Sequence, residues 1–201
     1  MVYEVPWSLL FQRFHPAVLY KDSPSAWEQR KLGECAQSFS YGLNASAVPY
    51  DGRNAYLRIT DIDDGTRQFS KNDLTSPDAD LARCDDYRLD EGDIVFARTG
   101  ASVGKTYIYQ ATDGVTYFAG FLIRMKMNGT ANPQFVFQST LCESYKRYVA
   151  ITSQRSGQPG VNAVEYAQCP VPIPSLPEQE AIGRFFSRLD DLITLHQRKR
   201  L

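Results

Sequence analysis

A glycine-rich stretch in the middle of the chain, from Gly92 to Thr106, reads GDIVFARTGASVGKT. Its first half contains an apolar run, Ile94 to Ala97, with the composition of a strand. Glycines then interrupt the run, and the β-branched and aromatic residues that follow, as far as Tyr109, favour a second strand. The stretch therefore predicts a strand, a glycine-rich loop and a returning strand, with basic side chains at the bend.

The loop of this stretch carries two cations, Arg98 and Lys105, next to glycines that leave backbone N–H groups accessible. Such a loop favours an anion, and phosphate is the obvious one. In a nucleotide-binding P-loop, four residues separate the first glycine from the Gly-Lys-Ser/Thr, and a helix begins directly after it. Here only three residues, Ala101 to Val103, fill that gap, and a strand-like run follows. The phosphate of a nucleic acid fits better, while a plain hairpin whose glycines only supply positive φ is a second interpretation.

Length and composition indicate a soluble globular protein. The chain has 201 residues, of which 43% are hydrophobic and 22% charged, so it predicts one domain with an appendage. No apolar run is long enough for a membrane span, and the N-terminus does not have the pattern of a secretory signal. Four cysteines are scattered without a CxxC pair, at positions 35, 84, 142 and 169. We therefore predict free thiols, a cytoplasmic protein, and neither a metal site nor a cofactor.

The charges are unevenly distributed, although the formal net charge is only −1. Residues 51–93 contain six Lys or Arg against twelve Asp or Glu, a net charge of −6. Residues 94–155 contain seven basic residues against two acidic ones, a net charge of +5. The glycine-rich loop belongs to this basic block, which favours a nucleic-acid ligand.

The remaining patterns predict an α/β (α+β) fold: an irregular leader over residues 1–26, a mixed, strand-rich domain over 27–174, and one long helix over 175–201. Within the domain, 55–60 and 117–125 are predicted strands, 132–150 is a predicted helix with Pro133 near its start, and 171–174 is a short extended edge. A second glycine-bearing segment, 153–162, carries Arg155 and Gln158 and is too broken by Gly and Pro for regular structure. It is either a second ligand-binding loop or a surface turn.

The last segment has the pattern of a coiled-coil helix. Pro177 and nearby acidic residues suit a first helical turn. Apolar residues then follow at spacings of three, four and three, which is the a/d pattern of a coiled-coil seam. These are Ile182, Phe185, Leu189 and Leu192. The seam predicts a dimer or subunit interface, and packing against the helix's own domain is the competing interpretation.

Several motifs, in order along residues 27–201, resemble the specificity subunits of type I restriction–modification systems. The resemblance is carried by six segments: 27–34 (WEQRKLGE), 56–65 (YLRITDIDDG), 92–105 (GDIVFARTGASVGK), 156–162 (SGQPGVN), 172–182 (PIPSLPEQEAI) and 189–193 (LDDLI). The chain matches one target-recognition domain followed by one spacer helix, whereas the family's usual chain carries two of each.

The resemblance implies a protein without a catalytic role. Its recognition domain would read one half of a bipartite target in double-stranded DNA. Modification subunits would dock on it and supply S-adenosylmethionine-dependent adenine methylation, and a restriction subunit would supply ATP-driven translocation and cleavage. With one recognition domain, two copies paired as a homodimer through residues 177–201 would restore the usual arrangement. A truncated chain gives the same pattern.

We expect both glycine-bearing loops to contact DNA through Arg98, Thr99, Ser102, Lys105, Arg155 and Gln158. An Arg can bind phosphate or a guanine edge, and Gln158 can read adenine. Residues 41–50 and 66–91 are our candidates for choosing the bases. Since the net charge is near zero, the isolated domain should bind weakly. Two alternatives stay open: an interaction protein that inhibits or caps a restriction complex without reading DNA, and an anion- or nucleotide-binding protein that uses Gly100 to Thr106.

Overall fold

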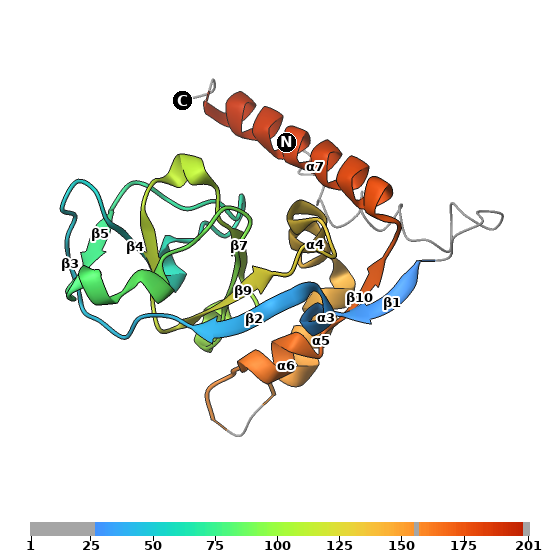
Figure 1. Ribbon diagram of the computed structural model, residues 1–201, viewed down its shortest axis with the longest axis horizontal. Coiled ribbons are helices and arrows are strands. Elements are labelled where there is room, and N and C mark those ends of the chain that lie inside the picture. The colour runs from blue at the N-terminus through green and yellow to red at the C-terminus, as the bar shows by residue number, and fades with distance from the viewer. Residues whose placement is uncertain (1–26, 155–156, 199–201) are drawn as a thin grey trace, which may run out of the picture.

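The computed structural model describes residues 27–154 and 157–198, so the predicted leader lies outside the described residues. A four-stranded antiparallel sheet lies at the centre, in the order β2–β9–β6–β7 (Figure 1). Its strands are β2 (Ala36–Tyr41), β9 (Leu122–Met127), β6 (Ile94–Ala97) and β7 (Thr106–Ile108).

The glycine-rich stretch forms the predicted hairpin within this sheet. Strand β6 pairs with β7 in a register that places Ile94 opposite Ile108 and Phe96 opposite Thr106. On its other edge β6 pairs with β9, so it lies between two hydrogen-bonded neighbours. All four residues of β6 are buried, and the predicted strand–loop–strand unit is confirmed.

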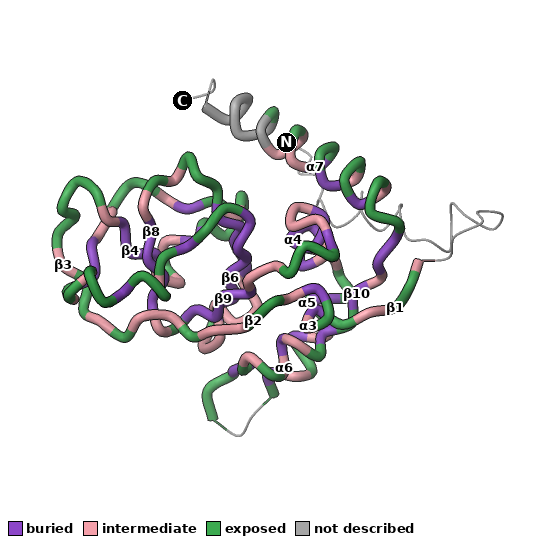
Figure 2. Tube along the Cα trace, in the orientation of Figure 1, coloured by how far each residue is buried: buried purple, intermediate pink, exposed green. Residues whose placement is uncertain are grey.

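Alternation along β6 separates two hydrophobic cores, because successive strand residues point to opposite faces of a sheet. Ile94 and Phe96 belong to the core beneath the helices. Val95 and Ala97 belong to a second core beneath the smaller strands. The central sheet is therefore covered on both faces, and β6, β7 and most of β9 are buried, whereas the edge strand β2 is partly exposed (Figure 2).

Short helices and a two-stranded ribbon cover the first face. The helices are α3 (Leu32–Cys35), α4 (Pro133–Ser139), α5 (Glu143–Thr152) and α6 (Ala163–Ala167). The ribbon pairs β1 (Glu28–Lys31) antiparallel with β10 (Pro170–Ile173), which confirms the short extended edge expected at 171–174. This ribbon brings the beginning and the end of the described domain side by side (Figure 1).

The second face is covered by small strand pairs and single helical turns. Strand β3 (Ala47–Pro49) pairs antiparallel with β5 (Thr75–Pro77), and β4 (Ala55–Leu57) pairs in parallel with β8 (Thr116–Phe118). The 3-10 turns are η1 (Ile59–Asp61), η2 (Leu81–Arg83), η3 (Asp85–Tyr87), η4 (Gly100–Ser102) and η5 (Ala111–Asp113). The architecture is thus the predicted mixed α/β fold.

Three predicted elements differ from the observed ones: one is shorter and two are divided. The strand expected over 55–60 ends at Leu57, and η1 follows. The strand expected over 117–125 is wrong as a single element, because a turn in which Leu122 N–H donates to Ala119 O separates β8 from β9. The two pieces then join different sheets.

The helix expected over 132–150 is divided into α4 and α5. The Asn132 side chain caps α4 by accepting from Phe135 N–H at 3.0 Å, and Pro133 occupies the first turn as predicted. At the other end of α4 the Thr140 hydroxyl donates to Phe137 O at 2.6 Å and also contacts the Thr106 hydroxyl at 2.7 Å. A side chain that bonds its own backbone in this way favours a helix end. The contact between Thr140 and Thr106 of β7 lies at the point where α4 ends.

Helix α7 (Leu176–Arg198) leaves the domain after β10 and packs on α4 (Figure 1). Gln179 is buried at its start, where it accepts from Asn132 N–H at 2.9 Å and donates to Pro174 O at 2.9 Å. Farther along, Gln138 donates to Asp190 at 2.9 Å. Phe186 is buried on the same helix face. Packing on the helix's own domain therefore uses a face centred on residues 179, 183, 186 and 190.

Gly183 marks the closest approach of α7 to α4. A Cβ at this position would lie 2.8 Å from Asn132 Oδ1 and 3.1 Å from Phe135 N. Alanine normally stabilises a helix by about 1 kcal/mol relative to glycine. Here we expect Gly183→Ala to lower the free energy of unfolding by about 1–3 kcal/mol, because the added methyl group forces the two helices apart.

Thermal unfolding checks this expectation, with Ala181→Gly on the exposed side of the same helix as the control. The control removes only helix propensity and should cost about 1 kcal/mol. A Gly183→Ala protein that is more stable than the wild type would contradict the close contact between α4 and α7.

Candidate nucleic-acid interface

The two glycine-bearing loops lie side by side and form one paired edge. Gly100 N–H donates to Pro159 O at 3.0 Å, and Val161 N–H donates to Arg98 O at 2.9 Å. Thr99 and Gly160 form an isolated antiparallel bridge between these bonds. Residues about sixty positions apart in sequence thus build a single surface feature, which we call the paired-loop edge (residues 98–104 and 157–161).

Two buried tyrosines hold the paired-loop edge from below. The Tyr166 hydroxyl donates to Ala97 O at 2.7 Å and accepts from Gly104 N–H at 3.1 Å. The Tyr145 hydroxyl donates to Gly104 O at 3.0 Å. Burial raises the pKa of both tyrosines above the ordinary value, so their hydroxyls stay protonated donors. These bonds hold the backbone at Ala97, where the loop leaves β6, and at Gly104, just before β7 begins.

The loop needs glycine at positions 100 and 104 for both conformational and steric reasons. Gly100 and Gly104 have φ values of +71° and +83°, a region that disfavours other residues. A Cβ on Gly104 would also lie 2.6 Å from Val149 Cγ1 of α5. A Cβ on Gly100 would lie 3.1 Å from Gln158 Nε2. Glycine therefore allows the loop both to turn and to approach its neighbours.

The polar residues predicted to contact DNA lie mostly on this edge. Arg98, Thr99 and Ser102 are partly exposed, and Gln158 is exposed. The Arg98 guanidinium lies over the Tyr41 ring, with 5.1 Å between Cζ and the ring centroid. Arg155 lies outside the described residues. The structure thus brings four predicted residues together, and it adds Tyr41, the first residue of the 41–50 candidate segment.

Lys105 occupies a different environment from the other predicted residues. Its side chain is only 9% exposed, and its ammonium lies 2.7 Å from Asp64 Oδ1 and donates to Ile62 O at 3.1 Å. This ion pair holds the pKa of the Asp64 carboxyl below its ordinary value. The contacts favour a structural role for Lys105, which ties the acidic turn at 61–65 to the hairpin.

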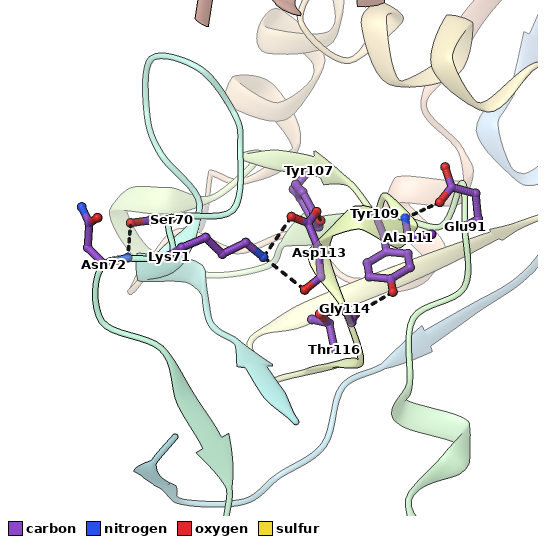
Figure 3. Close-up of polar contacts among 10 residues, drawn as sticks. All are labelled: Ser70, Lys71, Asn72, Glu91, Tyr107, Tyr109, Ala111, Asp113, Gly114 and Thr116. Atoms are coloured by element: carbon purple, nitrogen blue, oxygen red, sulfur yellow. Dashed lines mark hydrogen bonds and ion pairs between the residues drawn. The ribbon is translucent and has the colours of Figure 1, made fainter. Parts of the chain in front are cut away.

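The second candidate segment for base choice, residues 66–91, contacts another part of the domain. Lys71 Nζ lies 2.9 Å from Asp113 Oδ1, and Tyr107 donates to the same carboxylate (Figure 3). Glu91 accepts from Ala111 N–H. These contacts tie the segment to residues next to β7, and others tie it to Ser46, Asn54 and Asp61 on the second face of the sheet.

Within residues 27–154 and 157–198, no group of three His, Cys, Asp or Glu side chains is arranged to hold a metal ion. No helix in the same ranges is long and apolar enough to cross a membrane. After the glycine-rich loop the chain forms strand β7 rather than a helix, in contrast to a nucleotide P-loop.

Fold and site together define a mixed α/β domain with one paired-loop edge and a single attached helix. Residues 24–201 match the family of the type I restriction modification DNA specificity domain, and the chain belongs to this family. It is 26% identical over 178 residues to a protein named as the MjaX type I restriction enzyme specificity subunit of Methanocaldococcus jannaschii. That match covers 85% of this chain and 41% of the relative.

Solved structures share the fold. A chain from a study of complex assembly and conformational transition in the type I R-M system superimposes with a TM-score of 0.66 at 15% identity, over 95% of this chain and 46% of that chain. The HsdS subunit from Thermoanaerobacter tengcongensis gives 0.63 at 16% identity, over 92% and 47%. The type I S subunit from M. genitalium gives 0.61 at 13% identity, over 90% and 44%. The chain thus spans less than half the length of each of these relatives.

Proposed function

We propose that this chain is a non-catalytic specificity subunit that reads one half of a bipartite target in double-stranded DNA. The paired-loop edge carries this proposal. Arg98, Thr99, Ser102 and Gln158 present a cation and neutral donors on one surface, and such groups bind phosphates and base edges. Lys105 supports the edge from within, and Arg155 remains a predicted contact outside the described residues.

Partner subunits supply the rest of the activity in this proposal. The formal net charge of −1 gives little phosphate neutralisation, so the isolated chain binds DNA weakly. Modification subunits dock on the chain, bind the flanking DNA and perform the methylation, and a restriction subunit joins the same complex. Membership in the specificity-domain family supports this arrangement.

The coiled-coil character of α7 belongs to the same proposal. Phe185 and Leu192 of the predicted seam are 55% and 62% exposed, and Leu189 is partly exposed. Ile182 packs partly against the main core. The outer seam thus lies beside the face that contacts α4 and is available to a second helix. We propose a second copy of this chain as the occupant, because an identical helix offers a matching apolar seam in a two-fold symmetric pair.

Methylation mapping tests the proposed function. Cells carrying this chain and its modification subunit should methylate adenine in a bipartite target, and a homodimer predicts that the two halves form a palindrome. Cells with the modification subunit alone are the control. If the methylated sites are the same with and without this chain, the DNA-reading proposal is wrong, and the non-reading interaction protein takes its place.

A further inference from the structure

Arg98 is bonded through its backbone to two chain segments, and its side chain lies over an aromatic ring. Its backbone is fixed on both sides, because Arg98 N–H donates to Phe121 O at 3.0 Å and Arg98 O accepts from Val161 N–H. The guanidinium lies over Tyr41, which pairs with Ile123 at the end of β2. The Tyr41 hydroxyl accepts from Ala163 N–H at 3.3 Å. Both members of the stack are therefore anchored.

The donors of this guanidinium are not used within the described protein. Arg98 Nε is buried and makes no hydrogen bond. No ion pair involving Arg98 occurs in residues 27–154 and 157–198, in contrast to Lys105, whose ammonium is paired. Because Nε is buried, a large ligand can reach only the two terminal nitrogens. These present two parallel donors in the plane of the group.

We propose that Arg98 reads a guanine edge in the major groove and that Tyr41 is its positioning residue. This inference rests on the proposed function. Guanine presents two neighbouring acceptors, O6 and N7, which match two parallel donors, whereas adenine presents one acceptor and one donor. A planar group beside an aromatic face loses little entropy on bidentate binding, to a phosphate as well as to a base edge. The base edge is favoured because Arg98 lies over Tyr41, in the 41–50 segment that is a candidate for choosing the bases.

The central test compares Arg98→Lys with the wild type in the complete complex with its modification subunits. Methylation of a pool of double-stranded DNA targets, randomised one base pair at a time, measures the base preference. Arg98→Lys keeps the charge and loses the fork, so preference for guanine should fall about tenfold or more at one base pair only. The slope of binding against salt concentration should stay the same.

Two other results would overturn the inference. If Arg98→Lys leaves every base preference unchanged, or if binding weakens equally on all sequences, Arg98 contacts phosphate or nothing. Arg147→Lys is the matched control, because Arg147 is exposed on α5 and lies outside the paired-loop edge and outside both candidate segments for base choice. This control should leave the base preference as in the wild type.

The positioning role of Tyr41 has its own pair of variants. Tyr41→Leu removes the aromatic face and should relax the preference at the same base pair as Arg98→Lys. Tyr41→Phe keeps the ring without the hydroxyl and should restore the preference. Tyr41 is 44% exposed, so neither change empties the core, and thermal unfolding verifies folding. A relaxed preference in both variants, or in neither, would overturn the role of the ring.

A modified duplex separates this inference from the proposed function. Replacing the guanine at the identified position by 7-deazaguanine removes the N7 acceptor, so wild-type binding should weaken about tenfold and Arg98→Lys binding should not change. Equal effects on both proteins would overturn the guanine contact while leaving DNA reading intact. A wild-type complex without any sequence preference would overturn both.

Discussion

Replacing Gly42 by alanine is expected to lower the free energy of unfolding by about 3 kcal/mol or more. A Cβ at Gly42 would lie 2.2 Å from Ala119 O, 2.5 Å from Ala119 C and 2.6 Å from Phe118 O. All three are backbone atoms, so no rotamer change relieves the contact. Gly42 also donates to Leu122 O at 3.1 Å, and Leu43 N–H donates to Phe118 O at 2.8 Å. The methyl group must therefore separate the end of β2 from the segment between β8 and β9.

Thermal unfolding measures this effect, and the melting temperature should fall by about 6–12 °C. Gly65→Ala is the control, since a Cβ at Gly65 has only Asp63 Oδ1 nearby, at an ordinary distance of 3.5 Å. The control should stay within about 0.5 kcal/mol of the wild type. Since Tyr41 precedes Gly42, a folded Gly42→Ala protein should also lose base preference. Equal stability of the two variants would contradict the described packing at Gly42.

Replacing Phe185 and Leu189 together by aspartate is expected to abolish self-association through α7. Burying each side chain in a helix pair contributes about 1.5–3 kcal/mol. In the variant, the carboxylates added to one copy would also repel those added to the other. Because two residues change in each copy, the dissociation constant of the dimer should rise at least about 1000-fold, which corresponds to about 4 kcal/mol. In sedimentation, the particle should change from a dimer to a single chain of 22.7 kDa.

Arg184→Asp is the matched control for this double variant. It lies on the exposed, charged side of α7 and changes the net charge by the same amount without touching the seam. The control should stay dimeric. An unchanged mass for the Phe185/Leu189 variant, with wild-type sedimentation as reference, would show that the seam does not pair two copies.

Local sequence patterns predicted several elements of the structure, but not the strands β2, β3 and β5. The apolar run 94–97 and the β-branched run after Gly104 became β6 and β7. The proline and acidic residues near 177 correctly predicted the start of a helix. Helix α6 was not predicted, although Asn162 and Glu165 form a capping box that marks a helix start. That signal was present in the sequence, and the surrounding glycines and prolines obscured it.

The predicted boundaries of helices and strands were wrong where a contact with a distant part of the chain sets the boundary. The run 117–125 has strand composition throughout, yet its first part pairs with β4 and its second part with β6 and β2. The run 132–150 has helical composition, yet it breaks where Thr140 contacts Thr106. Composition along the chain contains no information about which partner a segment will find, so such breaks were not predictable.

The sequence alone determined the hairpin, the two glycine-bearing loops, the terminal helix and the family resemblance, because these depend on residue types at short spacing. Only the tertiary structure decided how the loop cations are used. Lys105 reaches Asp64 and is neutralised, whereas Arg98 reaches Tyr41 and keeps its donors unpaired in the described structure. Both side chains leave the same loop with the same charge. Their different roles follow from which distant residues packing places beside them.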